Sequence, residues 1–407
     1  MNCRHCKKPL LKTFLDLGYS PPSNAYLNKD ELSHPEAYFP LKITVCQGCW
    51  LVQTEDYAEA GSLFTDQYAY FSSASKSWLD HAKSFSEEII EQLGLTGASF
   101  VIEVASNDGY LLRNFVDAKI PCLGIEPTAS TAIAAEKLNV PVFRTFFSEE
   151  VGKKLATQGQ QADLIVGNNV YAHVPDINDF TLGLKAALKP GGTITLEFPH
   201  LMQLLAGSQF DTVYHEHFSY LSLMTVVQIF TKAGLRIWRV EQLRTHGGSL
   251  RIFGCHGDDE REPEESVRGV ILQELEHGLN RIGTYLDLQK RAEKIKADLI
   301  AFLVEKKRAG KTVAAYGAAA KGNTLLNFAG IKPDLLPVVC DAALSKQGKF
   351  MPGSHIPILP PQHLLELRPD YVLILPWNIA EEVLSQESAL KNSGTQFLIA
   401  IPRLQML

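Results

Sequence analysis

From residue 99 to residue 199 the sequence alternates short apolar runs with segments of helical spacing. The apolar runs predict strands, and the segments between them predict helices. The expected strands are 99–106, 121–127, 162–169 and 191–199, and the expected helices are 108–118, 130–139 and 177–188. Such alternation is typical of a parallel sheet with helices on both faces, so the expected fold class is α/β.

A second, smaller α/β unit is expected nearer the carboxyl end. "TVAAYGAAAKGNTLLNFAG", residues 312–330, reads as strand, glycine-rich turn and helix, and further strands are expected at 334–341 and 369–376. Residues 263–308 look helical and charged, which is typical of a connector. A chain of 407 residues is too long for one ordinary core. The expected domains are 1–75, 76–262 and 263–407.

Four of the seven cysteines form two Cys-x-x-Cys pairs within the first fifty residues. The pairs are Cys3 with Cys6 and Cys46 with Cys49. Each pair supplies two thiolates from a tight turn, and four thiolates complete a tetrahedral zinc site with no open position for chemistry. We therefore expect one structural zinc ion, with disulfides or free thiols as the alternative.

Charge and hydropathy argue against several classes of protein. The formal net charge is −6 and there is no long basic run, unlike a nucleic-acid-binding protein. No apolar run approaches the roughly 20 residues of a membrane span. The first ten residues lack the apolar stretch of a signal peptide. We expect a cytoplasmic protein, a monomer or small homo-oligomer, that binds neither nucleic acid nor membrane.

The turn after the first expected strand, in "FVIEVASNDGYLL", carries acidic and amide side chains and no phosphate-binding glycine pattern. This position binds nucleotides in α/β folds, and Glu126 follows Gly109 by 17 residues, the usual range for a carboxylate that holds ribose hydroxyls. S-adenosylmethionine, which has a ribose and a cation but no phosphate, fits this turn; an ordinary α/β turn is the alternative. The expected cofactor-binding residues are Glu103, Ser106, Asn107, Asp108, Gly109, Glu126, Asn168 and Asn169.

"VYHEHFSYLS", residues 213–222, places two histidines, a glutamate and two tyrosines among apolar neighbours. Such a cluster either binds a metal or moves protons. The HExxH spacing is absent, and histidine, glutamate and histidine adjacent in sequence rarely converge on one ion. Proton transfer is therefore favoured over a second metal site or a purely structural hydrogen-bonded cluster.

Taken in order, "EVASNDGYLL", "GIEP", "NNVYAHVPD", "YHEHFSYLS", "HGGSLR" and "AKGNTLLN" resemble the sugar C-methyltransferases that make branched-chain deoxysugars. The resemblance covers essentially the whole chain. It implies a zinc module, a class I (Rossmann-like) methyltransferase domain and a C-terminal Rossmann-like domain that contacts a nucleotide-sugar. It also implies methyl transfer from S-adenosylmethionine to carbon 3 of a dTDP- or GDP-linked 4-keto-6-deoxy sugar. Ala105 departs from the pattern, because glycine is expected there.

The resemblance further implies roles for individual residues. His217 matches the base that removes the proton from carbon 3, since a sugar C–H becomes a nucleophile only through an enolate. Glu216 and Tyr214 match residues that position the substrate and orient the base. His173 and Tyr68 match residues that contact the keto oxygen and its neighbours. The expected substrate-binding residues are Tyr70, Lys321, Asn323, Thr324 and Arg251.

Lys321 precedes a helix start, where an ammonium and backbone amides make an anion site. By resemblance this site would hold the diphosphate of the nucleotide-sugar. Two other functions stay open at this level. One is an O- or N-methyltransferase of a small molecule that uses His217 on a hydroxyl, and the other is a non-catalytic zinc-ribbon interaction protein.

Overall fold

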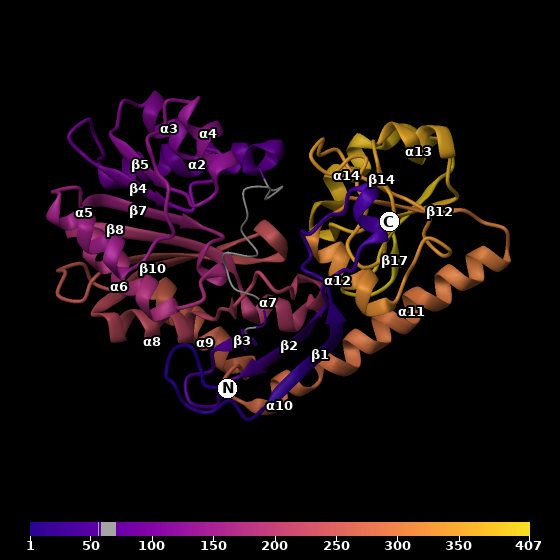
Figure 1. Ribbon diagram of the computed structural model, residues 1–407. Coiled ribbons are helices and arrows are strands. Elements are labelled where there is room, and N and C mark those ends of the chain that lie inside the picture. The colour runs from indigo at the N-terminus through magenta and orange to yellow at the C-terminus, as the bar shows by residue number, and fades with distance from the viewer. Residues whose placement is uncertain (56, 58–70) are drawn as a thin grey trace.

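The structure, a computed structural model, describes residues 1–55, 57 and 71–407. These residues form three β-sheets (Figure 1), and the N-terminal one lies below and between the other two. Within these described ranges, no helix combines the length and the hydrophobicity needed to cross a membrane.

The seven-stranded sheet carries the predicted α/β pattern. Its strands in spatial order are β10 (Leu235–Leu243), β11 (Ser249–His256), β8 (Leu188–Pro199), β7 (Ala162–Asn168), β4 (Val101–Val104), β5 (Cys122–Ile125) and β6 (Val142–Phe143). Strands β8, β7, β4, β5 and β6 run parallel, whereas β11 is antiparallel to both neighbours. The four predicted strands are therefore confirmed.

Helices cover both faces of this sheet, so its strands are buried on both sides. Leu164 and Val166 of β7 face one hydrophobic cluster, whereas Ile165 faces the other. Helix α2 begins after Ser75, whose Oγ accepts the N–H of Trp78 at 3.3 Å. The helices of this unit are α2 (Lys76–Leu93), α3 (Leu112–Asp117), α4 (Ala129–Glu136), α5 (Glu149–Thr157), α6 (Ile177–Ala187) and α8 (Leu223–Ala233). Helix α7 (Leu201–Ala206) packs instead in a hydrophobic cluster with β1 (Thr13–Ser20), α11 (Leu288–Arg308) and α12 (Ala320–Ala329).

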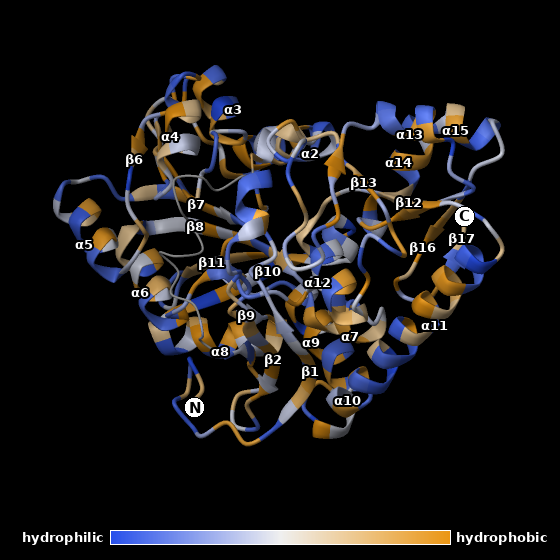
Figure 2. Cartoon of the chain, turned by 45° about the vertical axis from the view of Figure 1, so that its right-hand side comes forward, coloured by the Kyte–Doolittle hydropathy of each residue, from blue (hydrophilic) through white to orange (hydrophobic). Residues whose placement is uncertain are grey.

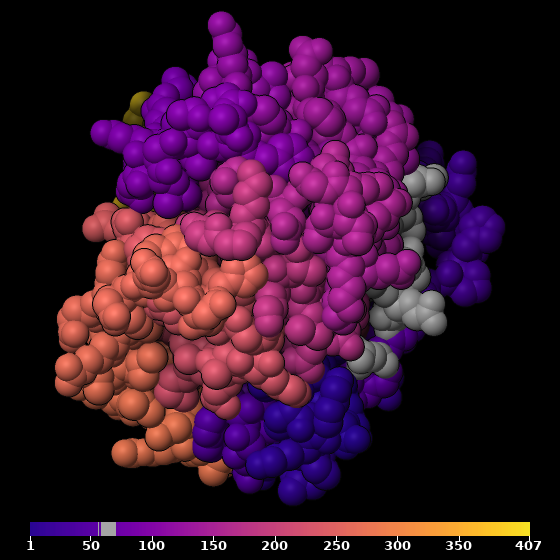
Figure 3. Space-filling view, turned by 90° about the vertical axis from the view of Figure 1, so that its left-hand side faces the viewer, coloured from indigo at the N-terminus to yellow at the C-terminus, as the bar shows by residue number. Residues whose placement is uncertain are grey.

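One strand of the N-terminal sheet comes from the middle of the chain. It consists of β1 (Thr13–Ser20), β2 (Phe39–Val45), β3 (Val52–Thr54) and β9 (Ser219–Tyr220), and β9 pairs antiparallel with β3. Because β9 begins two residues after His217, the N-terminal module is tied directly to the predicted base. In Figure 3 the indigo N-terminal residues lie against residues from the middle of the chain, coloured magenta to orange.

The second α/β unit is also confirmed. Its strands in spatial order are β14 (Ile358–Leu359), β13 (Val339–Cys340), β12 (Val313–Tyr316), β15 (Tyr371–Ile374), β16 (Gln396–Ile399) and β17 (Gln405–Met406). All neighbours are parallel except β17. Its helices are α12 (Ala320–Ala329), α13 (Gln362–Leu367), α14 (Ala380–Gln386) and α15 (Ser388–Asn392).

The connector is helical, as its composition predicts. It contains α9 (Glu265–Glu276), α10 (Ile282–Leu286) and α11 (Leu288–Arg308). Figure 2 shows α11 hydrophobic on one side and hydrophilic on the other, and its buried residues include Leu288, Ala292, Ile295 and Leu299, at spacings of three and four. That buried face packs against β1, α12 and β12. The expected boundaries after residues 75 and 262 stay a prediction.

Candidate active site

The turn after β4 has a backbone that alternates into the left-handed region. Ala105, Asn107 and Gly109 have φ of 56°, 50° and 78°. A Cβ atom makes this region unfavourable, although asparagine tolerates it better than most residues do. This geometry explains why glycine is expected at position 105, because the alanine there adopts a conformation that glycine reaches without strain.

Glu126 closes the turn from the end of β5. Its Oε2 accepts the N–H of Asn107 at 2.9 Å, and its Oε1 accepts the N–H of Thr128 at 2.9 Å. The N–H of Ser72, just before α2, donates to Asn107 Oδ1 at 3.0 Å. The turns after β4 and β5 are therefore joined through one carboxylate, and the chain entering α2 lies against them.

Several polar atoms around this turn are buried and have no hydrogen-bond partner among the described residues. They are Ser106 Oγ, Asp108 Oδ1 and both amide atoms of Asn168. Glu103 is buried as well, and its burial, together with the charges of Asp108 and Glu126, raises its pKa well above the usual range. Buried polar atoms without partners cost free energy unless a ligand or water satisfies them. The cluster of carboxyl groups favours a ligand that carries positive charge.

Asn169 links this turn to a buried histidine on the far side of β8. Asn169 has φ of 54°, and its Nδ2–H donates to His246 Nε2 at 2.9 Å. His246 lies in the short helix η5 (Thr245–Gly247). Burial and the nearby charge of Lys321 lower the pKa of His246 to about 4, so the ring is neutral at pH 7.

His217 is buried beside the short helix η3 (Tyr171–His173) that follows β7. Its Nδ1 lies 3.0 Å from the carbonyl oxygen of Thr212. Because a carbonyl oxygen can only accept, Nδ1 carries the proton and Nε2 carries the lone pair. Burial and the neighbouring His173 lower the pKa of His217 well below its usual range, so the imidazole is neutral at pH 7.

The predicted companions of His217 lie close to it. The ring of Tyr214 is centred 4.0 Å from the ring of His217, and the ring of His173 packs edge-on at 4.6 Å. Burial raises the pKa of Glu216 to about 7, and its Oε2 accepts Asn24 Nδ2–H at 2.6 Å. The other two predicted tyrosines, Tyr68 and Tyr70, lie outside the described residues.

Asn323 and Thr324, predicted to bind substrate, lie on α12, which packs against the short helix η4 (Phe210–Thr212). Thr324 Oγ1 donates to the carbonyl of Val213 at 2.8 Å, and Asn323 Nδ2 donates to the carbonyl of Ser23 at 2.6 Å. Both side chains are buried. The Thr324 bond docks α12 onto the segment that leads to His217, and the Asn323 bond docks it onto the N-terminal module.

Lys321 has three neighbours that sequence reasoning missed. Its Nζ donates to Asn378 Oδ1 at 2.6 Å and lies 4.5 Å from the ring centre of Trp377. Trp377 Nε1–H donates to Asp211 Oδ2 at 2.7 Å. Trp377 and Asn378 directly follow an expected strand, where α/β folds bind ligands, and that position was the available signal. The signal for Asp211 was one carboxylate in a mostly apolar run.

Arg251 takes part in a buried ion-pair network within the seven-stranded sheet. Its Nη2 lies 3.0 Å from Glu197 Oε2, and its Nη1 lies 3.2 Å from Glu241 Oε2. His81 of α2 lies 2.9 Å from the same Glu197 oxygen. These contacts join β8, β10, β11 and α2, and they account for Arg251 without a substrate.

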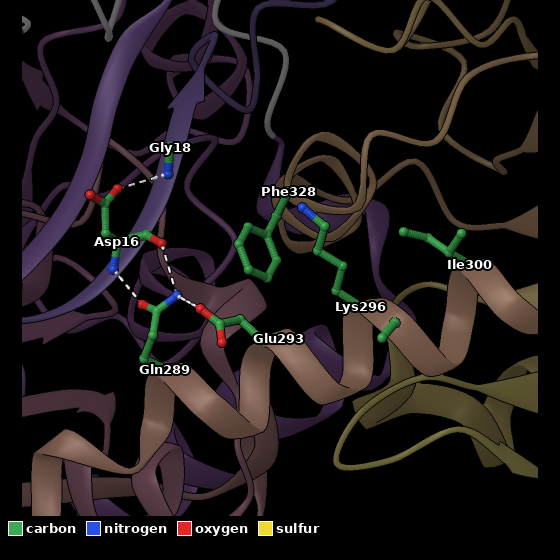
Figure 4. A pocket seen from close by; sticks show the side chains of 8 residues that line it. Asp16, Gly18, Gln289, Glu293, Lys296, Ile300 and Phe328 are labelled. Atoms are coloured by element: carbon green, nitrogen blue, oxygen red, sulfur yellow. Dashed lines mark hydrogen bonds between the residues drawn. The ribbon is translucent and has the colours of Figure 1, made fainter.

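A surface hollow of about 630 Å³ lies away from all these residues (Figure 4). It is lined by Phe328 and Lys296 among others, between β1, α11 and α12. Asp16 N–H donates to Gln289 Oε1 at 2.8 Å at its edge. None of the predicted site residues lines this hollow, so it is a seam between the N-terminal module and the connector.

Comparison with known proteins gives the family. C-methyltransferase NovU from Streptomyces niveus is 33% identical over 400 residues, which are 98% of this chain and 95% of that protein. The chain belongs to the C-methyltransferase family. Three family descriptions match successive segments of it: "Putative zinc binding domain" at 3–64, "Methyltransferase domain" at 78–240 and "C-methyltransferase C-terminal domain" at 244–402.

Some solved methyltransferase structures are similar to parts of this C-methyltransferase. Magnesium protoporphyrin IX methyltransferase from Synechocystis PCC 6803 is 14% identical, with a TM-score of 0.35, and the match covers 43% of this chain and 82% of that one. An S-adenosylmethionine-dependent methyltransferase from Clostridium acetobutylicum is 10% identical, with a TM-score of 0.35, and covers 43% and 90%.

The four cysteines of the C-methyltransferase form one cluster whose geometry fits zinc. Their Sγ atoms all lie within 4.8 Å of one another, and Cys3 with Cys49 and Cys6 with Cys46 are each 3.5 Å apart. A tetrahedral zinc ion with four thiolates places its sulfurs about 3.8 Å apart, given Zn–S bonds of about 2.3 Å. Gly48 N–H donates to Cys46 Sγ at 3.3 Å, which orients one thiolate.

The turn after β4 fits S-adenosylmethionine, the methyl donor of this C-methyltransferase. Unpartnered buried atoms at Ser106, Asp108 and Asn168 and the carboxyl groups of Glu103 and Glu126 suit a ligand that has hydroxyl and ammonium donors. When bound, the cofactor supplies an electrophilic methyl group. The placement of each cofactor contact stays a prediction.

Replacing Glu126 tests the cofactor contacts. We expect Glu126→Ala to weaken S-adenosylmethionine binding by about 1.5–3 kcal/mol, the range for hydrogen bonds to a charged group. The measurement is isothermal titration calorimetry on folded protein. Glu136→Ala is the matched control, because that glutamate is half-exposed on α4 and pairs only with Arg144 among the described residues. Unchanged affinity in Glu126→Ala would contradict the assignment.

Replacing Gly109 with alanine tests the backbone conformation of the same turn. An alanine Cβ at Gly109 would lie 3.1 Å from Ala135 Cα and would hold a φ of 78°. We expect Gly109→Ala to lower the free energy of unfolding by more than the ~1–2 kcal/mol that a left-handed residue costs. Gly94→Ala is the control for φ alone, because Gly94 has φ of 60° and nothing lies within 4 Å of its added Cβ. Equal losses in urea unfolding would show that the close contact has no effect.

Proposed function

We propose that this C-methyltransferase methylates carbon 3 of a nucleotide-diphosphate-linked 4-keto-6-deoxy sugar through an enolate. The observation that carries the proposal is the state of His217, a buried neutral imidazole with Nδ1–H bonded to Thr212 and its lone pair on Nε2. The sulfonium methyl is already electrophilic, so a hydroxyl or amine nucleophile needs little help. A carbon next to a ketone needs a base, and this site has one.

The proposed reaction begins with transfer of the carbon 3 proton to Nε2 of His217. The electron pair of the broken C–H bond forms the double bond between carbons 3 and 4, and negative charge moves to the keto oxygen. Carbon 3 would then bond to the methyl group supplied by S-adenosylmethionine as the methyl–sulfur bond breaks, its electron pair staying on sulfur as a neutral thioether, and the ketone would be restored while the proton on His217 is lost to solvent. Low pKa keeps His217 unprotonated, so the base is available throughout the neutral pH range.

The companions of the base take complementary roles in this proposal. Tyr214 and His173, in ring contact with His217, orient the imidazole and line the sugar site. Glu216 holds a sugar hydroxyl or amino group from its buried position beside Asn24. Tyr68 is proposed, from the sequence alone, to contact the keto oxygen, and Tyr70 to bind the substrate.

The residues on α12 and in the sheet divide into two groups. Asn323 and Thr324 dock α12 beside the sugar site, and Arg251 positions Glu197; we propose that these three shape the site indirectly. Lys321 is a cation whose charge acts on both His217 and His246, and its ammonium lies 4.5 Å from the ring centre of Trp377. It is therefore proposed to contact the substrate.

Solvent exchange tests the proposed function. dTDP- and GDP-linked 4-keto-6-deoxy sugars are incubated with the enzyme in D₂O without S-adenosylmethionine, and deuterium at carbon 3 is followed by NMR and mass spectrometry. We expect enzyme-dependent exchange, and a new methyl group at carbon 3 once the cofactor is added. An O- or N-methyltransferase would instead give a methylated product without exchange, which would refute the proposal.

A further inference from the structure

Lys321 is the second residue of α12 in the C-terminal α/β unit, but its ammonium lies toward the unit of the seven-stranded sheet. Its Nζ lies 4.5 Å from the ring centre of Trp377, and a Cβ added to Gly247, the neighbour of His246, would lie 2.4 Å from that same ring. The positive charge of Lys321 lowers the pKa of both His217 and His246. The neighbouring geometry agrees, because Thr324, one turn further along α12, bonds the carbonyl of Val213, and His217 bonds the carbonyl of Thr212. The helix that carries Lys321 and the proposed base are thus bonded to successive carbonyl groups of one segment.

The turn before Lys321 is poorly suited to a diphosphate. Ala318 N–H donates to Asp341 Oδ2 at 2.6 Å, and Ala343 N–H donates to Asp341 Oδ1 at 2.7 Å. A carboxylate of the chain therefore takes a backbone donor that a phosphate would need. The charge of this carboxylate is balanced by Lys346, whose Nζ lies 3.6 Å from Asp341 Oδ2 and donates to the Ala318 carbonyl. The ammonium of Lys321 instead donates to Asn378 Oδ1 and lies over the ring of Trp377.

The charge of Lys321 is supported by one buried carboxylate. Burying an ammonium is unfavourable unless an opposite charge or hydrogen bonds compensate. Asp211 is fully buried and acts on Lys321 electrostatically, while Trp377 joins the two by bonding Asp211 Oδ2 and placing its ring beneath the ammonium. The ring face adds a cation–π attraction. His217 and His246, which also face Lys321, are neutral at pH 7.

We propose that Lys321 donates a hydrogen bond to the keto oxygen at carbon 4 as the enolate forms, and that Asp211 is the positioning residue that keeps this lysine charged. The proposal rests on the proposed function. As the carbon 3 proton passes to His217, negative charge develops on the keto oxygen, and the ammonium stabilises it there. Preorganised charge in a buried site is the most effective form of such stabilisation.

The direct test compares the reacting end of the substrate with its diphosphate. In Lys321→Met we expect cofactor-independent deuterium exchange at carbon 3 to fall by about 10²–10³-fold, the typical cost of removing one oxyanion donor. Affinity for dTDP or GDP, measured by calorimetry, is expected to stay within about twofold of wild type. Lys332→Met is the control, because that lysine lies beyond α12 and bonds the Gly353 carbonyl.

Two outcomes would overturn the inference. One is loss of nucleotide affinity in Lys321→Met with exchange at saturating substrate unchanged, which would return Lys321 to the diphosphate. The other is unchanged exchange and unchanged affinity. Absence of exchange in the wild-type enzyme with every keto sugar would refute the proposed function instead, and the inference with it.

Asp211→Asn keeps an acceptor for Trp377 but removes the charge. Because Asp211 raises the pKa of Lys321, which burial lowers, the pKa of Lys321 falls in this variant. We expect its exchange rate, expressed as a ratio to wild type at each pH, to fall as pH rises and to recover in mild acid. The ratio is needed because burial raises the pKa of Glu216 to about 7 and that of Asp211 to about 6, so wild type also titrates in this range. An equal loss at every pH would indicate a merely structural role for Asp211 and would overturn its part of the proposal.

Discussion

Turnover in His217→Asn is expected to fall by about 10²–10⁴-fold, the usual cost of losing a general base. Asparagine is the sharpest replacement, because its Nδ2–H can keep the bond that His217 Nδ1–H makes to the Thr212 carbonyl. It lacks only the Nε2 lone pair. The measurements are steady-state turnover, deuterium exchange at carbon 3 and S-adenosylmethionine affinity, and the affinity is expected to be unchanged.

His215→Asn is the matched control for this prediction. His215 is a buried histidine two residues away, but its Nε2 lies 3.2 Å from the Pro40 carbonyl in the N-terminal module. We expect it to retain most of the turnover. If exchange persisted in His217→Asn and disappeared in His173→Asn, the base would be His173.

The second large effect is expected at the zinc cluster. Cys46→Ser removes one of four thiolates, and in small modules the binding energy of the metal is also folding energy, about 10–16 kcal/mol in zinc-finger peptides. Three of the cysteines belong to a hydrophobic cluster shared with the seven-stranded sheet, and β3 pairs with β9. We therefore expect loss of soluble, folded protein, and loss of turnover in whatever remains.

Elemental analysis and thermal unfolding measure this result. We expect about one zinc ion per wild-type chain, the stoichiometry of a single four-thiolate site. Cys340→Ser is the control, because Cys340 is equally buried but lies in β13, outside the cluster. It should keep the full zinc content. A metal-free Cys46→Ser protein with native unfolding temperature and full activity would show that the cluster has no structural role.

Local sequence was sufficient to predict most strands and helices of the two α/β units. Strands β4, β5, β7 and β8 follow from apolar runs, and α2 ends at Gly94, which adopts φ of 60°. Pairing between distant segments was not predictable in this way. Strand β9 is two residues long, and it forms a strand only because it pairs with β3, which is far away in the sequence.

The site divides in the same manner. The residue types at Glu126, His217 and the four cysteines carry enough chemistry to indicate a cofactor turn, a base and a metal site. The role of Lys321 did not follow from its motif, because a helix start beside a lysine predicts an anion site whatever lies across from it. The structure shows Asp341 occupying that turn and Trp377 directing the ammonium elsewhere.

By itself, the sequence determined most elements of the α/β units, the two Cys-x-x-Cys pairs and the identities of the titratable groups, because these depend on residues a few positions apart. Only the tertiary structure decided which groups are charged. His217 is neutral because it is buried beside His173, and the charge of Lys321 is favoured by that of Asp211, 110 residues earlier in the chain. Burial and long-range charge set a pKa, and neither exists until distant segments of the chain have packed together.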